Sequence, residues 1–340
     1  MSVRRRRFRV PVLSAIVGAL VLSQLVAASA RPVSVGAART RGARIAGADP
    51  VIAAAGDIAC DPTDSSFNNG LGTTKKCKEM ASSDLLVSGG FAAVLALGDE
   101  QYECAGESAF AASYAPSWGR VVGTTYPAIG NHEYQTSGGS GCNPVPGRGY
   151  QNYFVGAGAP QVLGPNNGYY YSFDVGTWHL IALNANCNTV PCKAGSTQEL
   201  WLKQDLAAHP NSCVLAYWHQ PRFASGNGKL INNKSVAAFW NDLVAAHADL
   251  VLGGHRHYYE RLGKMDANGA ASSTGVREII AGTGGKSLAG LIDTFWPTNE
   301  LFDNKHYGVL ELTLHPASYD WSFLAIDGTV LDSGSDTCSV

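Results

Sequence analysis

The sequence lacks several patterns that would place it in a familiar class. No apolar run reaches the roughly 20 uninterrupted residues that a membrane-spanning helix needs, because the run from about 10 to 27 is broken by Pro11, Ser14, Ser23 and Gln24. No internal repeat or interdomain linker is visible, and the cysteines form no C-x-x-C metal knuckle. We therefore expect neither a membrane span nor a repeat array nor a zinc knuckle.

A nucleotide-binding loop is also missing. Gly285-Lys286-Ser287 ends like such a loop, but the pattern requires a glycine at position 280, where Ile280 stands. The sequence therefore predicts no P-loop at this place.

The first 30 residues have the pattern of a secretory signal peptide. Arginines at 4–7 and 9 precede the apolar run, and Ala28-Ser29-Ala30 forms an A-x-A cleavage site. Arg5-Arg6-Arg7-Phe8 fits part of a twin-arginine signal, so export by the Sec or the twin-arginine route is expected. The alternative is an uncleaved membrane anchor, which the short and broken apolar run disfavours. We expect removal of residues 1–30 and a secreted or extracytoplasmic protein.

Cleavage would change the charge of the chain. It removes five arginines and no acidic residue, which leaves 20 basic residues against 27 acidic ones, a formal charge of −7 compared with −2 for the whole chain. An acidic surface repels phosphate backbones and anionic membranes at long range. We expect no dedicated nucleic-acid or membrane binding, so any affinity for phosphate must be local. The oligomeric state stays open.

The eight cysteines are an even number in a chain expected to be exported, which predicts disulfide bonds. Eight cysteines allow 105 connectivities. Only the short loop from Cys187 to Cys192 suggests a local pair, and the other pairings stay open.

The rest of the chain divides into two parts. Residues 31–48 are rich in Arg, Ala and Gly without apolar periodicity, and are expected to form a flexible lead-in or pro-segment. Residues 49–340 are long enough to bury a substantial core. Because no linker divides them, we expect a single domain.

Five short apolar runs bounded by glycine or polar residues are expected to be buried strands. Helices lie between several of them, including one opened by a capping box from Ser196 to Glu199 and one for which Ser235 is a candidate cap. Residues 169–183 look like a hairpin, and residues 308–330 alternate like antiparallel strands. A mixed α/β fold follows. The five runs are 51–55, 92–97, 126–129, 213–218 and 249–252.

Each of these runs is followed by side chains that can bind a metal. In open α/β sheets the loops beyond the carboxyl ends of strands form the ligand site, so we expect these side chains to meet. Glycines before several of them let the backbone turn sharply. The segments are Gly56-Asp57, Gly98 to Tyr102, Gly130 to Glu133, His219 to Pro221 and Gly253 to His257.

These five segments, in this order, resemble the calcineurin-like metallophosphoesterase superfamily, and specifically its purple acid phosphatase branch. The segments Ser196 to Leu202 and Gly282 to Gly285 are also similar to that branch. Most members of the superfamily carry a histidine two residues after the first aspartate, where this chain has Ala59. The purple branch also lacks that histidine and supplies a tyrosine, which Tyr102 matches.

The resemblance implies a fold and a ligand set. The fold is a four-layer αββα sandwich of two mixed β-sheets flanked by helices, with residues 49–340 as one metallophosphoesterase catalytic domain. The implied ligands, carried over residue by residue, are Asp57, Tyr102 and His257 for one ion, Asn131, His219 and His255 for the other, and Asp99 as the bridge.

The donor types agree with two different ions. Carboxylate and phenolate oxygens suit Fe(III), whereas imidazole nitrogens and an amide oxygen suit a divalent ion such as Zn, Fe or Mn. The resemblance then implies a secreted phosphatase that hydrolyses phosphomonoesters by attack of a metal-bound hydroxide. It makes His132 an outer-sphere group that orients the substrate or protonates the leaving oxygen. The alternative role of His132 is to position Asp99.

Two other functions stay open. A phosphodiesterase or nucleotidase would use the same site, and a secreted binding protein without catalysis would hold metals only for its structure. For the phosphomonoesterase and for the phosphodiesterase or nucleotidase alike, the expected partner is a small phosphoester substrate. Glu260 and Arg261, which follow the histidine pair, are expected to form a structural ion pair.

Overall fold

The structure, a computed structural model, describes residues 48–210 and 213–339. The expected signal peptide, residues 1–30, lies outside the described residues, as does the expected lead-in up to residue 47. Within the described ranges no helix is long and apolar enough to cross a membrane.

The first of two large sheets has six strands and contains the start and the end of the described chain. Its strands β1, β2 and β3 are parallel, whereas β13 runs antiparallel to β1 and continues into hairpins with β14 and β15. The alternating segment 308–330 thus forms antiparallel strands, as expected. In spatial order the strands are β15 (Val330–Thr337), β14 (Ser318–Ala325), β13 (Gly308–His315), β1 (Val51–Ala55), β2 (Val94–Ala96) and β3 (Thr125–Pro127).

The second sheet has seven strands and is also mixed. Its central strands β5, β6, β9 and β11 are parallel, and β4, β10 and β12 pair antiparallel at its two sides. The expected hairpin is β4 and β5, with Val175 opposite Trp178. The order is β12 (Asn299–Asp303), β10 (Tyr259–Leu262), β11 (Arg277–Ala281), β9 (Leu250–Gly253), β6 (Cys213–Tyr217), β5 (Trp178–Ala182) and β4 (Tyr171–Val175). Strands β7 (Phe223–Ala224) and β8 (Ile231–Asn232) form a separate pair.

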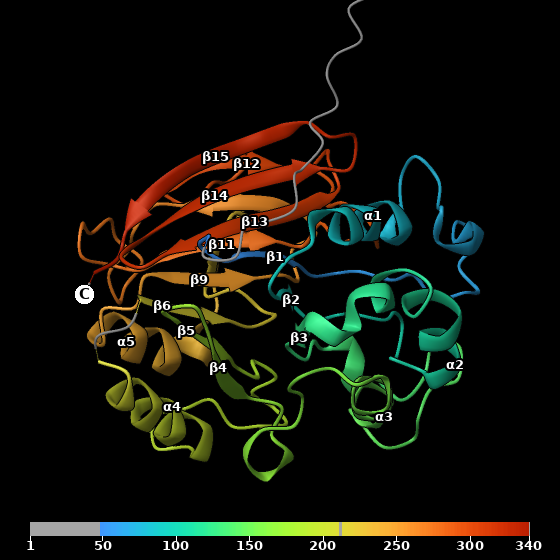
Figure 1. The fold of residues 1–340 in the computed structure, drawn as a ribbon, viewed down its shortest axis with the longest axis horizontal. Helices are drawn as coiled ribbons and strands as arrows, with labels where there is room; N and C mark the ends of the chain where they lie inside the picture. The colour runs from blue at the N-terminus through green and yellow to red at the C-terminus, as the bar shows by residue number, and fades with distance from the viewer. Residues whose placement is uncertain (1–47, 211–212, 340) are drawn as a thin grey trace, which may run out of the picture. The chain divides into compact units, whose positions relative to one another are not determined.

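Helices cover the outer face of each sheet. In Figure 1, α1, α2 and α3 lie together beside β2 and β3, whereas α4 and α5 lie beside β4, β5 and β6. The helices are α1 (Glu79–Gly89), α2 (Glu107–Ala109), α3 (Arg148–Ala157), α4 (Thr197–Ala208) and α5 (Ala237–Ala245).

Three apolar clusters hold these layers together. Because successive side chains of a strand point to opposite faces, Ile52 of β1 packs between the two sheets, whereas its neighbour Ala53 packs toward α3 through a cluster that includes Phe154. The outer face of the second sheet packs on α4 and α5 through residues such as Leu202 and Trp240. The expected four-layer αββα sandwich of two mixed sheets is confirmed.

Of the two helix caps predicted from the sequence, one is confirmed and the other is wrong. Ser196 Oγ accepts a hydrogen bond from Glu199 N at 3.3 Å and begins α4, as expected. The expected cap Ser235 is wrong, because Asn233 Oδ1 accepts the N–H of Ser235 at 3.1 Å and begins a short 3-10 turn before α5. An asparagine side chain reaches the backbone two residues on more effectively than a serine does.

All eight cysteines form disulfide bonds. The expected pair of Cys187 and Cys192 is confirmed. The longest-range bond joins Cys213 at the start of β6 to Cys338, 125 residues later, after β15. It thereby links the second sheet to the first. The remaining pairs are Cys60–Cys77 and Cys104–Cys142.

Candidate metal centre

The expected metal ligands lie in loops at the carboxyl ends of β1, β2, β3, β6 and β9. On the side of β1, three of them are in mutual contact. Tyr102 Oη lies 2.9 Å from Asp57 Oδ1 and 3.0 Å from His257 Nε2. His257 Nε2 lies 3.1 Å from the same Asp57 oxygen. This group offers a carboxylate, a phenol and an imidazole to one point.

Asp99 lies between this group and a second one. Its Oδ2 is 3.1 Å from Tyr102 Oη and 3.1 Å from His219 Nε2. His255 Nδ1 in turn lies 3.3 Å from His219 Nε2. One ligand atom each from Asp99, His219 and His255 lie within 4.8 Å of one another. A single carboxylate oxygen therefore touches both groups, as a bridging ligand would.

Asn131 follows β3 at the border of this second group. Its Oδ1 accepts a hydrogen bond from Gln220 Nε2 at 3.4 Å, and Gln220 comes directly after His219. Gln220 also donates to Asn186 Oδ1 at 3.1 Å, and Asn186 Nδ2 donates to the carbonyl of Gly130 at 3.2 Å. The amide of Asn131 is thus held in place from the loops after β5 and β6.

The backbone is strained at four of the seven expected ligands. Asp57, Asp99, His255 and His257 have φ of 58°, 50°, 67° and 52°. Left-handed conformations cost residues other than glycine about 1–3 kcal/mol and are found mainly at functional sites. The preceding Gly56 is required sterically, since a Cβ there would lie 2.8 Å from the carbonyl oxygen of Leu97. These loops turn sharply in order to direct the side chains to one place.

Outer hydrogen bonds orient two of the imidazoles. His219 Nδ1 donates to the carbonyl of Leu97 at 2.8 Å, and His257 Nδ1 donates to the carbonyl of Ser287 at 3.0 Å. Each bond leaves Nε2 facing the carboxylates. This is the arrangement that fixes ring orientation and tautomer in metal-binding histidines.

In the second group, burial and neighbouring charges both change the pKa values of the two histidines. Burial opposes charge on His219, but the buried carboxylate of Asp99 raises the pKa of His219 to about 9. Burial and the neighbouring charge of His219 lower the pKa of His255 to about 4. Because metal ligands must be deprotonated, a divalent ion would compete with a proton for His219 Nε2. The buried carboxylates, the phenol and the imidazoles fit a pair of metal ions.

His132 is fixed at both its backbone and its ring. Its N–H donates to Asp99 Oδ1 at 2.9 Å, and its Nδ1 donates to the carbonyl of Glu103 at 2.7 Å. The ring lies with its centroid 4.3 Å from that of Tyr102, and its Nε2 is 4.0 Å from Asp99 Oδ2. The backbone of His132 therefore positions Asp99, while Nε2 is directed toward the centre.

Glu133 lies in one of the five expected donor segments, but sequence reasoning gave it no role of its own. Its buried carboxylate accepts the N–H groups of Asp99 at 3.1 Å, Gly130 at 2.9 Å and Gln101 at 3.3 Å, and so joins the loops after β2 and β3. Its place directly after Asn131 and His132 was the available signal.

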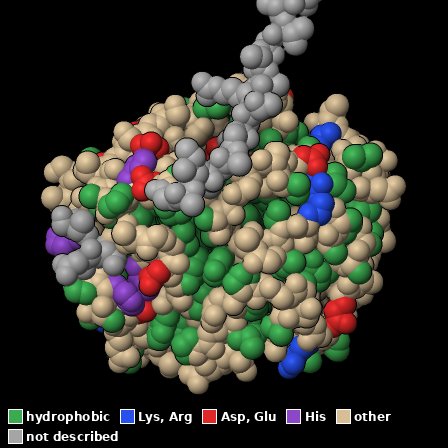
Figure 2. All heavy atoms as spheres, viewed as in Figure 1, with side chains coloured by type: hydrophobic (Ala, Val, Ile, Leu, Met, Phe, Trp, Pro, Cys, Tyr) green, Lys and Arg blue, Asp and Glu red, His purple; other side chains and the backbone are tan. Residues whose placement is uncertain are grey.

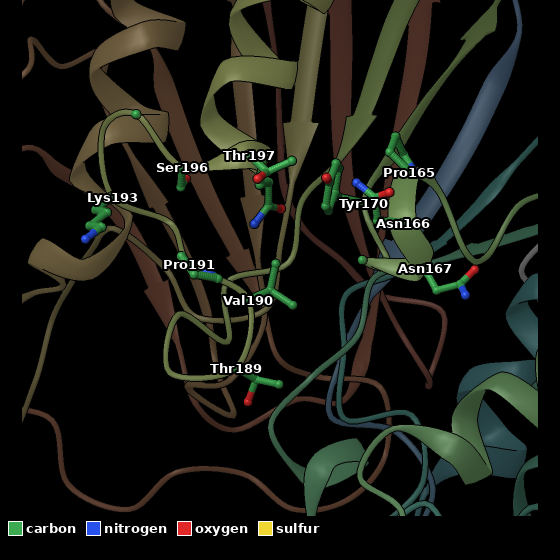
Figure 3. A pocket seen from close by; sticks show the side chains of 13 residues that line it. Pro165, Asn166, Asn167, Tyr170, Thr189, Val190, Pro191, Lys193, Ser196 and Thr197 are labelled. Carbon is green, nitrogen blue, oxygen red and sulfur yellow. The ribbon is translucent and has the colours of Figure 1, made fainter.

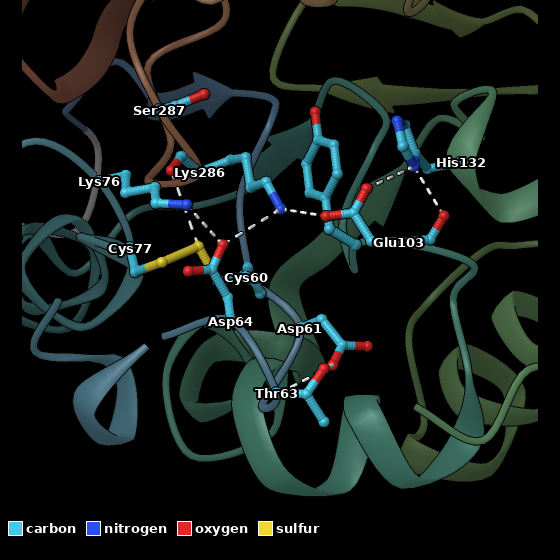
Figure 4. A network of polar contacts seen from close by, with 12 residues as sticks. Cys60, Asp61, Thr63, Asp64, Lys76, Cys77, Glu103, His132, Lys286 and Ser287 are labelled. Carbon is cyan, nitrogen blue, oxygen red and sulfur yellow. Dashed lines mark hydrogen bonds and ion pairs between the residues drawn. A yellow bond between two sulfur atoms is a disulfide. The ribbon is translucent and has the colours of Figure 1, made fainter. Parts of the chain in front are cut away.

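Lys286 and Ser287 were also missed. Figure 4 shows the Lys286 side chain directed at Glu103, which in turn faces His132. Lys286 Nζ also lies 4.4 Å from the centre of the Tyr102 ring. The segment that failed as a nucleotide loop thus contributes to this centre. Its only local signal was a lysine and a serine after a run of glycines.

The expected ion pair between Glu260 and Arg261 is wrong. Glu260 Oε2 accepts the N–H of Ser225 at 2.9 Å, whereas Arg261 Nε pairs with Asp332 at 2.7 Å. The two residues are neighbours in β10, and neighbours in a strand point to opposite faces.

A profile of the Calcineurin-like phosphoesterase family matches residues 52–259, which is more than half of the chain. The chain belongs to this family. The matched range contains every expected ligand from Asp57 to His257, and the expected resemblance is confirmed.

Several curated relatives are named as acid phosphatases, among them purple acid phosphatases. Purple acid phosphatase 15 of Arabidopsis thaliana is 29% identical over 126 residues, which cover 36% of this chain and 23% of the relative. An acid phosphatase of Aspergillus ficuum is 27% identical over 245 residues, covering 54% of this chain and 39% of the relative. The chain therefore spans less than half the length of these relatives.

Solved structures agree in fold. Purple acid phosphatase PPD1 from yellow lupin (Lupinus luteus) has a TM-score of 0.63 at 18% identity, covering 85% of this chain and 53% of the lupin chain. A dimetal phosphatase from Danio rerio has a TM-score of 0.55 at 15% identity, covering 86% of this chain and 100% of the fish chain.

A pocket of about 430 Å³ lies apart from the expected ligands (Figure 3). It is bordered by Tyr170, by Val190 and Pro191 of the disulfide-closed loop, and by Lys193 and Thr197 at the start of α4. None of the expected ligands lines it. A molecule bound there would contact the loop after β5 rather than the metal centre.

Glu133 gives the first prediction. Glu133→Gln replaces one acceptor oxygen by a donor and leaves a backbone N–H of the Asp99 or Gln101 loop unpaired. We expect a loss of about 10- to 100-fold in metal affinity or activity, measured by metal analysis and steady-state kinetics. Glu107→Gln is the matched control, because Glu107 is exposed and accepts hydrogen bonds from the side chains of Asn143 and Asn152 rather than from a ligand loop. Full metal content with normal turnover in Glu133→Gln would contradict this role.

Proposed function

We propose that this chain is a secreted, dinuclear-metal phosphatase that hydrolyses small phosphomonoesters. The observation that carries the proposal is the contact of Asp99 Oδ2 with both donor groups, at 3.1 Å from Tyr102 Oη and from His219 Nε2. Membership of the calcineurin-like phosphoesterase family supports it. So does similarity to relatives named as acid phosphatases.

The proposed ligand assignment follows the two donor groups. The oxygen-rich group would hold Fe(III), and the imidazole-rich group a divalent Zn, Fe or Mn ion. Bound there, the two ions would lower the pKa of water and offset the charge of the phosphoryl oxygens. The proposed ligands are Asp57, Tyr102 and His257 in the first group, Asn131, His219 and His255 in the second, and Asp99 between them.

Besides holding the metals, the protein's own residues would orient the phosphoester and supply a proton to its leaving oxygen. The Nδ1 of His132 is committed to the Glu103 carbonyl, so Nε2 is the atom that would face the substrate. We assign His132 the role of orienting the phosphoester or protonating its leaving oxygen. The ion pair of Lys286 with Glu103 holds the segment that positions His132.

The disulfides bear on the compartment. Four such bonds fit an oxidising environment outside the cytoplasm. We propose export by the Sec or the twin-arginine route, with residues 49–340 as a single catalytic domain.

Metal content and substrate choice test the function. Purified protein is expected to contain about two metal ions per chain and to hydrolyse p-nitrophenyl phosphate, and chelation should abolish turnover. Preference for bis-p-nitrophenyl phosphate or nucleotides would instead identify a diesterase or nucleotidase. Full metal loading without turnover of any phosphoester would reject the proposal in favour of a metal-containing binding protein.

Tyr102 tests the identity of the first ion. A phenolate bound to Fe(III) should give a visible charge-transfer band, which Tyr102→Phe should remove. Tyr153→Phe is the control, because that ring stacks on Phe110 away from the centre. An active, colourless wild-type protein containing only Zn or Mn would contradict the iron assignment.

His132 tests the proton transfer. His132→Ala is expected to keep its metals and to lose at least about 10²-fold in kcat. His306→Ala, at a histidine that pairs with Asp303, should keep wild-type kcat. Loss of metal in His132→Ala would instead reassign the His132 side chain as a metal ligand or as a group that positions one, because the backbone N–H that donates to Asp99 is kept in this variant.

A further inference from the structure

A second cluster of metal-type donors lies apart from the candidate metal centre, between the second sheet and α4. It consists of Asp174 in β4, His179 in β5, Asp205 in α4 and His209 directly after α4. On the face shown in Figure 2, histidine and acidic side chains lie together in the region of α4 and α5. The group shares no residue with the expected ligands of that centre.

The donors are close enough to share an ion. One ligand atom each from Asp174, His179 and His209 lie within 4.8 Å of one another. His179 Nδ1 is 2.8 Å from Asp174 Oδ1, and the two imidazoles stack with centroids 3.6 Å apart. Ligand atoms around a tetrahedral Zn²⁺ lie about 3.4 Å apart, given metal–ligand distances of about 2.1 Å. Binding an ion would require the side chains to rotate from the stacked arrangement until their ligand atoms reach that spacing.

Asp205 orients both imidazoles. His179 Nε2 donates to Asp205 Oδ2 at 2.8 Å, and His209 Nδ1 donates to the backbone carbonyl of Asp205 at 2.8 Å. Ser172 Oγ fixes the same carboxylate by donating to Oδ1 at 2.9 Å. Asp205 thus engages one nitrogen of each ring, and the proposed ligand atoms are the other two, His179 Nδ1, which faces Asp174, and His209 Nε2. Hydrogen bonds of this kind orient the histidines of zinc sites.

The cluster is partly exposed, so an ion can enter it from solution. The His179 side chain is 2% exposed, whereas His209 is 33% and Asp174 64% exposed. The buried imidazole provides a fixed ligand and the two outer side chains can close over the ion. A water molecule would complete four coordination.

We propose that Asp174, His179 and His209 bind a Zn²⁺ ion or a similar borderline divalent ion, with Asp205 orienting the rings. Two imidazoles and one carboxylate are the ligands that such ions prefer. The ion would fasten the end of α4 to the β4–β5 hairpin and stabilise the fold. This proposal is independent of the phosphatase proposal.

The competing explanation is a charged clamp, in which a protonated His179 pairs with Asp174 and Asp205 and binds no metal. His315 provides a matched case. It lies between Asp49 and Asp320 in the same manner, but it belongs to no group of three metal-type donors in the described part of the chain. A comparison with His315 therefore separates a metal site from an ion pair.

Zinc counting tests the proposal in the full chain with its catalytic centre intact. After equilibration with ZnCl₂ and removal of free ion, the wild type is expected to retain one more Zn per chain than His209→Ala or Asp174→Asn. His315→Ala should match the wild type. Zinc at about 100 times its Kd should raise Tm by about 5 °C more in the wild type than in either site variant.

Two results would overturn the site. Equal zinc counts and equal Tm shifts in the wild type and both site variants would leave only the charged clamp. Loss of zinc in just one variant would refute the three-ligand assignment. Because Asp174 is largely exposed, Asp174→Asn stays informative even if His209→Ala fails to fold, and circular dichroism of each variant shows which case applies.

Discussion

The buried carboxylate of Asp99 is the interaction on which the rest of the candidate centre depends. It is 2% exposed and contacts the phenol of Tyr102, the imidazole of His219 and the backbone N–H of His132. A buried charge is costly unless partners surround it. The loops after β2, β3 and β6 must therefore meet at this carboxylate. The three loops converge because each of them supplies a partner for this buried carboxylate.

The scaffold makes that convergence possible. The left-handed backbone at Asp57, Asp99, His255 and His257 would relax if the strands before it could move. Those strands are buried on both faces, by the opposite sheet within and by helices outside. Close packing on both sides leaves them little freedom. The rigidity of the sandwich is what maintains the strained geometry at its edge.

Much of this arrangement could be predicted from the sequence, because strands and the donors after them are local patterns. A buried run followed by Gly56-Asp57 already indicates a strand, a turn and a ligand. Features that depend on distant contacts could not be predicted. Glu133 acts through backbone amides of another loop, and Lys286 meets Glu103 across 183 residues. Of the four disulfides, only the short loop from Cys187 to Cys192 could be predicted, because eight cysteines allow 105 connectivities.

The position of the Cys213–Cys338 bond in the sequence determines when this disulfide can form during synthesis and export. It joins residues 125 positions apart and encloses all strands from β6 to β15. The bond cannot form until residue 338 has been synthesised, so it is the last of the four disulfides that a growing chain can complete. If the chain were exported unfolded, this bond could form only after residue 338 had crossed the membrane, whereas export in the folded state would bring the two cysteines together before crossing.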